Sequence, residues 1–450
     1  MPEYYKLGIV GMGPAGIGMA MSLRGTDTIE NTICFERGST TSISDCSTQS
    51  KNVCCCSEIC NIISGVGGAS TVSSGKISDY PAGSGLVNFF DSEEQLKHMY
   101  KSLLLYLADT ISLKKIIVDD EVRNYTNTFY KQRNIEYKYY DVYEFDGERY
   151  RSFLQRIIQE LCNDGLQLYD NTEVLHIDRD PETMLFTISV KTNQGKKQFI
   201  VHDLVLAIGS LDLHSALIES IIKPTVSNYE VGLRVEAPSD VFKNTLACHG
   251  DLKLKFDTGR TYCVTENGNI LSYKTSGLYL LEGCCDPSAL TNFTNMAILV
   301  KIKDKEDVYS FLKNYREKFN GIPIKQRFVD YINMKESGIN AITTLVSAVN
   351  GDINRLFPTN INNAIKDFIQ YVLLDTMNID ADTLTLVAPE LKILRNLQIS
   401  SSFSVDNNCY VIGAATGRFR GILQSFCSGI RCGQLYTGGK SYVHMGSTLW

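Results

Sequence analysis

The stretch from Lys6 to Leu23, KLGIVGMGPAGIGMAMSL, decides the fold of this chain. Residues Lys6 to Val10 are mainly apolar and predict a short buried strand, whereas Ile17 to Leu23 have helical spacing. Between them lies GMGPAG, which matches the pattern GxGxxG. A glycine-rich turn that joins a strand to a helix is typical of dinucleotide-binding α/β folds.

Each glycine of this turn has its own expected role. Gly11 permits the tight turn, Gly13 lets a pyrophosphate approach the backbone, and Gly16 lets the helix pack closely on the strand. The free amides and the positive end of the helix, which begins near Pro14 and Ala15, would then face the phosphates. We therefore expect these five residues to bind the ADP half of a dinucleotide.

A second apolar strand, Ile33 to Phe35, ends at Glu36, 20 residues after Gly16. An acidic side chain at this place can accept hydrogen bonds from an adenosine ribose. Glu36 and its neighbour Arg37 are therefore predicted cofactor-binding residues. The alternative is a glycine turn in an unrelated α/β protein, which would not need a strand, loop, helix, strand and acid in this order.

Composition excludes several classes of protein. The 450 residues are 44% hydrophobic and 21% charged, as in a globular protein of two or three domains. The net charge of −6 and the lack of a basic run argue against nucleic-acid binding. No apolar stretch approaches the roughly 20 residues of a membrane helix, and a strand pattern at the N-terminus leaves no room for a secretory signal. We read the 14 cysteines as reduced thiols and expect a cytoplasmic protein.

Later segments favour FAD over NAD by resemblance. A helix is expected at Tyr150 to Cys162, three strand-like runs follow, and the apolar strand near Leu204 ends in a turn at Gly209. Another strand, Cys409 to Ile412, leads to a glycine-rich turn and a helix. This order resembles FAD-dependent oxidoreductases of the aromatic-hydroxylase type, in which the last turn contacts the ribityl and phosphate groups. The resemblance implies cofactor contacts from the following residues: Gly209, Gly413, Thr416, Gly417, Arg418, Gly421 and Ile422.

A closer resemblance covers most of the chain. Six stretches are similar, in the same order, to motifs of a family of FAD-dependent dehydrogenases; they begin at Gly65, Gly232, Arg260, Thr291, Ala388 and Gly413. The first of them implies that Gly67 and Gly68 also lie at the cofactor. Two positions depart from the family pattern, because Ala414 and Ser74 stand where the family has aspartates. Ala414 therefore cannot supply the ribityl hydrogen bond that the resemblance implies at that position.

The predicted fold class is α/β, with a discontinuous Rossmann-type FAD-binding domain and an inserted α+β substrate domain. We assign 1–210 and 381–450 to the FAD domain and 211–380 to the insert, with 95–149 as a cap or insertion that the pattern does not define. Within the insert, alternation at Leu252 to Phe256 and at Met296 to Ile302 predicts strands. Asn267-Gly268 predicts a hairpin turn.

Three side chains are candidates for catalysis: Lys76, Cys263 and Arg420. Each also has an ordinary interpretation, as a solvated loop lysine, a small buried thiol and an interdomain ion pair, respectively. The dense cysteine cluster formed by Cys46, Cys54, Cys55, Cys56 and Cys60 contains no CxxC pair and no nearby histidine. We therefore expect no metal.

The sequence thus predicts an FAD-dependent dehydrogenase or reductase that transfers hydride between flavin and a small organic substrate, with NAD(P)H as a conceivable transient reductant. The alternative is a flavin- or nucleotide-binding protein that serves assembly or sensing without turnover. Ala414 and Ser74 motivate that alternative. We expect a small-molecule partner and neither nucleic acid nor membrane, and the pattern does not fix an oligomeric state.

Overall fold

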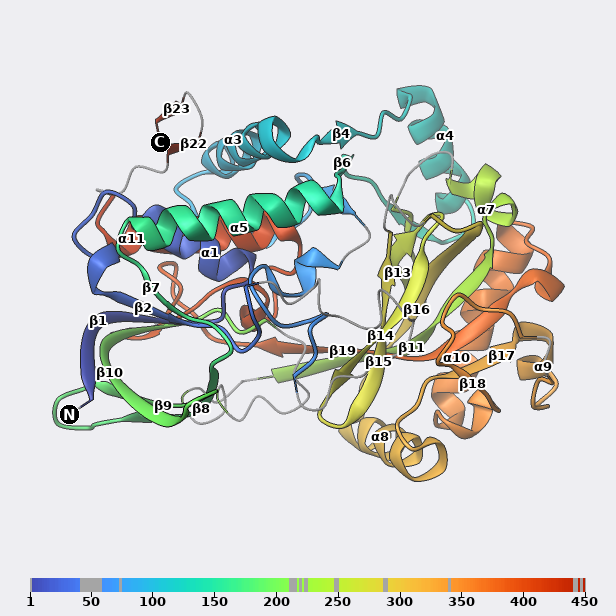
Figure 1. Cartoon of the computed structure of the whole chain (residues 1–450). Coiled ribbons are helices and arrows are strands. Elements are labelled where there is room, and N and C mark those ends of the chain that lie inside the picture. Colours follow the sequence, from blue (N-terminus) through green and yellow to red (C-terminus); the bar gives the residue numbers. More distant parts are fainter. Residues whose placement is uncertain are drawn as a thin grey trace.

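The computed structural model describes residues 2–40, 59–72, 75–209, 217, 221, 226–246, 251–285, 290–338, 341–439, 444–445 and 448–449. Two eight-stranded sheets dominate this part of the chain. Figure 1 shows the first sheet with its helices in one half of the molecule and the second sheet in the other. Ser73, Ser74, His214, His249, the predicted boundary at 210 and four cysteines of the N-terminal cluster lie outside the described residues.

The first sheet has the order β20-β21-β10-β1-β2-β7, and β8 and β9 extend it through β10. Strands β21, β10, β1, β2 and β7 pair in parallel with one another, whereas β20 is antiparallel to β21 and β9 is antiparallel to β10. Its strands are β1 (Glu3–Val10), β2 (Thr32–Phe35), β7 (Gln167–Tyr169), β8 (Glu173–Arg179), β9 (Phe186–Thr192), β10 (Gly195–Leu206), β20 (Ser404–Asp406) and β21 (Cys409–Val411). This is the Rossmann-type α/β arrangement that the glycine loop predicted.

The carboxyl ends of the parallel strands lie in one row. Residues paired across five neighbouring strands are Tyr169, Phe35, Val10, Leu206 and Val411. Because parallel strands in register end at the same edge, the turns that follow them must lie side by side. Ligands of open α/β sheets bind at this edge.

Helices α1 (Pro14–Ser22), α5 (Gly147–Asn163) and α11 (Ile422–Tyr436) lie together on one face of the first sheet (Figure 1). Helices α1 and α11 pack backbone against backbone. A Cβ atom on Gly429 would stand 2.0 Å from the carbonyl oxygen of Ala15, and one on Gly18 would stand 2.5 Å from that of Phe426. Only glycine permits so close an approach, so the start of α1 is fixed against the middle of α11.

The other face of this sheet is covered by a meander of β8, β9 and the first half of β10. The sequence predicted two separate strands near Gln198 and Leu204, but they form one strand, β10. Its first half pairs antiparallel with β9, and its second half pairs parallel with β1 and β21. A single long strand therefore belongs to both layers.

The second sheet has the order β18-β17-β19-β11-β16-β13-β12-β5. Its strands are β5 (Glu136–Lys138), β11 (Val226–Pro238), β12 (Lys253–Phe256), β13 (Gly259–Thr265), β16 (Phe293–Ile302), β17 (Ile324–Arg327), β18 (Val349–Asn350) and β19 (Thr385–Asn396). Since β19 pairs with β11 and β17, the second sheet extends beyond the predicted boundary at residue 380. Strand β5 joins it from the region 95–149.

The predicted hairpin at Asn267-Gly268 is not formed. Strand β13 pairs with β12 and β16, whereas the next strand, β14 (Asn269–Thr275), pairs only with β15 (Leu278–Cys284). Asn267 therefore lies where the chain steps from one sheet to another, and its φ of 48° suits a turn. The hairpin between paired strands instead turns at Ser276-Gly277, two residues with positive φ.

Other elements complete the described chain. The remaining helices are α3 (Glu93–Ile111), α4 (Asp120–Lys131), α7 (Ser239–Leu246), α8 (Lys305–Phe319), α9 (Phe328–Ile332) and α10 (Thr359–Phe368), which continues as a π-helix (Ile369–Thr376). Short 3-10 helices span Ile29–Asn31, Gly68–Thr71, Ser84–Phe89, Ile353–Arg355, Ala381–Thr383 and Gly413–Thr416. Small ribbons are formed by β3 (Lys76–Ser78), β4 (Lys114–Lys115) and β6 (Val142–Glu144), and by β22 (His444–Met445) and β23 (Thr448–Leu449).

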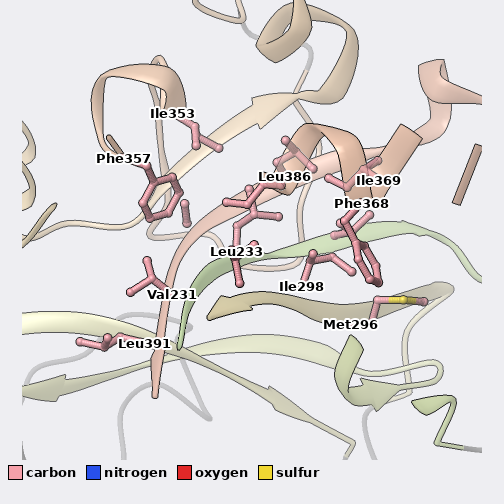
Figure 2. Close-up of a cluster of buried hydrophobic side chains, with 14 of the residues drawn as sticks. Val231, Leu233, Met296, Ile298, Ile353, Phe357, Phe368, Ile369, Leu386 and Leu391 are labelled. Atoms are coloured by element: carbon pink, nitrogen blue, oxygen red, sulfur yellow. The ribbon is translucent and has the colours of Figure 1, made fainter. Parts of the chain in front are cut away.

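The second sheet has one apolar and one charged face. Figure 2 shows the apolar face, where Val231, Leu233 and Ile298 contribute to a core that also includes Phe368. Side chains of a strand alternate between faces, so the residues between these apolar ones point the other way. On β11 they include Glu230 and Arg234. The charged face is therefore a direct consequence of the strand pattern, and it holds part of the candidate site.

Candidate functional site

The glycine loop after β1 has the geometry that its sequence predicted. Gly11 has a φ of 96°, and a Cβ atom there would stand 2.6 Å from the carbonyl oxygen of Ala207. A Cβ atom on Gly16 would stand 2.0 Å from the carbonyl oxygen of Gly11. By contrast, no described atom lies within 4 Å of a Cβ on Gly13. Two glycines are thus required by the fold, and the third faces open space among the described residues.

Helix α1 begins at this loop with an uncompensated positive end. Gly13 is its N-cap and Pro14 occupies its first turn. The helix has no side-chain cap and no acidic residue in the first turn. Its free amides and its dipole therefore suit an anionic group such as a pyrophosphate.

Glu36 is buried and joins three backbone segments. Its carboxylate accepts hydrogen bonds from the amides of Met12 (2.8 Å), Gly38 (3.0 Å) and Gly65 (2.8 Å). Burial raises the pKa of this carboxyl, although the three donors oppose the effect. The side chain thus holds the glycine loop in place, and its contact with a ribose stays a prediction. Its neighbour Arg37 donates to Ser64 Oγ at 2.9 Å.

The second glycine-rich segment lies against the first. The amide of Gly67 donates to the carbonyl oxygen of Met12 at 2.8 Å. A Cβ atom on Gly68 would stand 3.7 Å from the Cα of Gly13. The structure therefore brings Gly67 and Gly68 to the glycine loop, and their contact with a cofactor stays a prediction.

The closing turn after β21 meets the start of α1. A Cβ atom on Gly413 would stand 2.6 Å from the Cβ of Ala15. Thr416 is buried, and its hydroxyl donates to the carbonyl oxygen of Gly413 at 2.7 Å. Gly417 has a φ of 80° and ends the turn. The two turns predicted to hold the two halves of FAD are thus neighbours.

The other predicted cofactor residues lie along the same edge. Gly209 follows β10 with a φ of 72°, and no described atom lies within 4 Å of its Cβ position. Gly421 is exposed and is the N-cap of α11, whose first residue is Ile422. Arg418 is exposed. No described contact assigns these residues to a cofactor, so their roles stay predictions.

Cys263 lies on the charged face of the second sheet in an unusual backbone conformation. Its φ is 46°, and the pairing of β13 with β16 is irregular between Tyr262 and Thr265. Non-glycine residues with positive φ are concentrated at functional sites. Its thiol donates to Glu282 Oε1 at 3.3 Å, and its carbonyl oxygen accepts from Arg234 at 2.6 Å. Burial, with help from Glu282, raises the pKa of the thiol to about 11.

Four side chains beside Cys263 form what we call the buried ion cluster: Arg234, Glu282, Glu390 and Lys392. Arg234 Nη1 lies 3.5 Å from Glu390, and Lys392 Nζ lies 3.0 Å from Glu390 and 3.4 Å from Glu282. Burial raises the pKa of Glu390. Burial also disfavours the charge of Glu282, but Lys392 and Arg234 outweigh it and lower that pKa. Glu282 is therefore the more strongly ionised of the two carboxyls.

The structure brings the three catalytic candidates to the second sheet. Lys76 Nζ lies 3.5 Å from the carbonyl oxygen of Val264, the residue after Cys263. Arg420 donates to the carbonyl oxygen of Ile393 at 3.4 Å, and its charge acts on Tyr262, the residue before Cys263. Residues from three distant parts of the sequence thus meet at the second sheet, two of them at β13 and Arg420 at β19.

Sequence reasoning missed most of the buried ion cluster. Arg234, Glu390 and Lys392 lie in the stretches that resemble the family and begin at Gly232 and Ala388. The resemblance gives only their sequence similarity and does not show that these side chains pair. A signal was present, because each is a charged residue in an otherwise apolar strand pattern. Glu282 follows four residues that read as an ordinary strand, and nothing nearby in the sequence marked it as a partner of Cys263.

No group of three or more His, Cys, Asp or Glu side chains among the described residues is arranged to hold a metal ion. Of the N-terminal cysteine cluster only Cys60 is described; it is buried, and its sulfur accepts from the amide of Lys274 at 3.4 Å. In the described part of the chain, no helix combines the length and apolar character that crossing a membrane requires.

Comparisons with known proteins give distant likenesses. No family model matches the sequence, and no curated protein is significantly similar to it. L-proline dehydrogenase from P. horikoshii is 13% identical, with 99% of this chain and 96% of that chain covered and a TM-score of 0.41. Glycine oxidase from Geobacillus kaustophilus is also 13% identical, with 98% and 96% covered and a TM-score of 0.38. A glycerol-3-phosphate dehydrogenase from Bacillus halodurans, complexed with FAD, is 9% identical, with 97% and 66% covered and a TM-score of 0.40.

Proposed function

We propose that this protein is an FAD-dependent oxidoreductase that acts on a small organic molecule. One observation carries the proposal. The strands β1, β10 and β21 end in register, and the turns after them present Gly11, Gly209 and Gly413 at one edge of the sheet. At that edge a Cβ atom on Gly13 would meet no described atom within 4 Å, whereas a Cβ atom on Gly11 or Gly16 would clash with a backbone carbonyl oxygen. Such a cradle suits an extended dinucleotide.

The residues at this edge fit FAD in two parts. The loop from Gly11 to Gly16 would hold the pyrophosphate and the ADP half. Glu36 would keep this loop in place by accepting a hydrogen bond from the amide of Met12. The turn from Gly413 to Gly417 would hold the flavin half. FAD supplies hydride- or electron-accepting chemistry when it is bound.

The chain's own contribution to the chemistry would come from the charged face of the second sheet. Cys263 is held by Glu282 and by its strained backbone, and its raised pKa keeps the thiol protonated near neutral pH. A neutral thiol can donate a hydrogen bond or a proton but is a poor nucleophile. Because the single S–H hydrogen of Cys263 is donated to Glu282, we assign this thiol a positioning role beside the substrate, with Lys76 and Arg420 as neighbouring positive charges.

The same reading favours a cytoplasmic protein. The nine described cysteines form no disulfide with one another, which supports a reducing environment.

The visible absorption spectrum of the purified protein tests the proposal, followed by anaerobic additions of NADH and NADPH. A flavin spectrum that bleaches establishes an FAD enzyme reduced by nicotinamide. Bound flavin that bleaches only with an organic substrate establishes a substrate-reduced dehydrogenase. Bound flavin without any turnover supports the non-catalytic alternative, which the alanine at position 414 motivates. A colourless protein that also fails to bind added FAD overturns the proposal.

A further inference from the structure

Arg420 stands out on the charged face because of its position. It lies between the closing turn of the first sheet and the start of α11, yet its Nη2 reaches the carbonyl oxygen of Ile393 on β19 of the second sheet. That contact is long, at 3.4 Å, and joins the guanidinium only to a neutral acceptor. The side chain thus lies where the predicted flavin turn meets the second sheet.

Arg420 also lacks a negative partner among the described residues. Its Nε is buried and makes no hydrogen bond there, and no described carboxylate forms an ion pair with it. Burial lowers the pKa of its guanidinium; Tyr262 and Glu230 oppose this shift, whereas the nearby charge of Arg260 adds to it. A desolvated cation without a counter-ion is costly to a folded protein unless a ligand supplies the missing charge.

The neighbouring cations are already paired. Arg260 donates two hydrogen bonds to Glu230, at 2.8 and 2.6 Å, and Lys253 lies 2.8 Å from Asp251. The two cations of the buried ion cluster face its two carboxyls, and the pKa of one of these, Glu390, is raised by burial. Arg420 is therefore the surplus positive charge of this face.

Tyr262 supplies a donor at the same place. Its ring lies near three cations, with Lys253, Arg260 and Lys392 at 5.2, 4.9 and 5.2 Å from the centroid. Its hydroxyl makes no hydrogen bond within the described chain, and Arg420 is among the charges that act on it. An anion bound by Arg420 would therefore meet a positive potential and a free phenolic donor.

We propose that Arg420 and Tyr262 bind the carboxylate of a small organic-acid substrate next to Cys263. The planar guanidinium fork matches a carboxylate in shape, and the Nε of Arg420 has no hydrogen-bond partner among the described residues, so it can serve as one of the two donors of a two-point contact. This proposal rests on the proposed function, because it names the substrate class of the same site. A neutral analogue such as an amide lacks the charge that Arg420 requires and should bind poorly.

Small carboxylates and their amides provide the test. Acetate, propionate and benzoate are added to the full-length FAD-loaded protein, with acetamide, propionamide, benzamide and chloride added in parallel. The thermal unfolding midpoint and the shift of the flavin spectrum are measured against concentration. We expect saturable effects from the carboxylates alone. Equal effects from the amides or from chloride overturn the proposal.

Three variants sharpen the test. Arg420→Gln should weaken carboxylate binding about tenfold or more. The carboxylate affinity of Arg420→Lys should lie between those of Arg420→Gln and the unmodified protein. Arg327→Gln removes the same charge from β17, where Arg327 pairs with exposed Asp382 at 3.0 Å, and should bind carboxylates normally. Unchanged binding by Arg420→Gln overturns the proposal.

The stability of the Arg420→Gln variant without ligand shows whether Arg420 binds a ligand or instead stabilises the fold. Since the substitution removes an unpaired buried charge, the variant should be at least as stable as the unmodified protein and should keep its flavin. A large loss of stability, or loss of flavin, would make Arg420 a structural or cofactor residue and overturn the proposal. A colourless protein that still binds carboxylates through Arg420 would overturn the flavin assignment alone. A flavin-loaded protein without any carboxylate response would overturn the carboxylate site alone.

Discussion

Gly413 and Ala15 are in such close contact that a Cβ atom on Gly413 would stand 2.6 Å from the Cβ of Ala15. The first residue belongs to the closing turn near the C-terminus, and the second belongs to the first turn of α1. Their contact places the two glycine-rich turns of the chain side by side. The edge of the first sheet is therefore assembled from both ends of the sequence.

This contact predicts a coupled effect of two substitutions. Gly413 has a φ of 63°, so Gly413→Ala should cost about 1–2 kcal/mol in backbone strain and about 1–3 kcal/mol in overpacking. Ala15→Gly removes the clashing atom, so the double variant should recover the packing part. Denaturant unfolding at fixed FAD concentration measures all four proteins. Strictly additive effects would show that the two turns do not touch.

Gly13→Asp should abolish flavin retention without unfolding the protein. The new side chain meets no described atom within 4 Å, but it places a carboxylate where the pyrophosphate is expected. Gly85→Asp is the matched control, because Gly85 is exposed and its Cβ position is also open. Flavin absorbance per protein is the measurement. Full flavin occupancy in Gly13→Asp would remove the ADP site from this loop.

Alkylation of Cys263 should require alkaline pH. Its pKa of about 11 exceeds the ordinary thiol value, so the reactive thiolate forms only as the pH rises toward 11. Peptide mapping after iodoacetamide treatment gives the rate at this residue. In the denatured protein the midpoint should return to about 8.5. Glu282→Gln removes a nearby negative charge and should lower the midpoint in the folded protein, whereas a midpoint near 8.5 in the unmodified fold would contradict the burial of this thiol.

Removing one member of the buried ion cluster should lower the free energy of unfolding by several kcal/mol. Arg234 is fully buried, and Arg234→Met leaves Glu390 without one of its two cations. The loss of one partner of a buried pair typically costs about 3–5 kcal/mol. The second substitution, Glu390→Gln, removes the uncompensated charge and should restore part of the loss. Denaturant unfolding of the single and double variants checks this, and a double variant less stable than Arg234→Met would count against the pairing.

Local sequence determined several elements of the first sheet and of the helices that pack on it. The loop from Gly11 to Gly16 encodes part of its own geometry, because glycine itself permits the positive φ of Gly11 and because Gly16 packs tightly against Gly11, five residues before it. Apolar runs and their spacing likewise located β2, α5 and α11 within a few residues. Sequence reasoning failed at Asn267-Gly268, since a turn signal states that the chain bends but not which strands then pair.

Tertiary structure alone decided the site. Lys76 and Cys263 meet at β13 and Arg420 contacts β19, and Glu36 joins the amides of Met12 and Gly65, through contacts between segments far apart in the sequence. The lack of an ion pair for Arg420 is visible only after the pairs of Arg260, of Lys253 and of the buried ion cluster have been located in space. Backbone preference and side-chain periodicity are local properties and can be read along the chain. Burial and charge pairing depend on which segments pack together, so they are set only when the whole chain has folded.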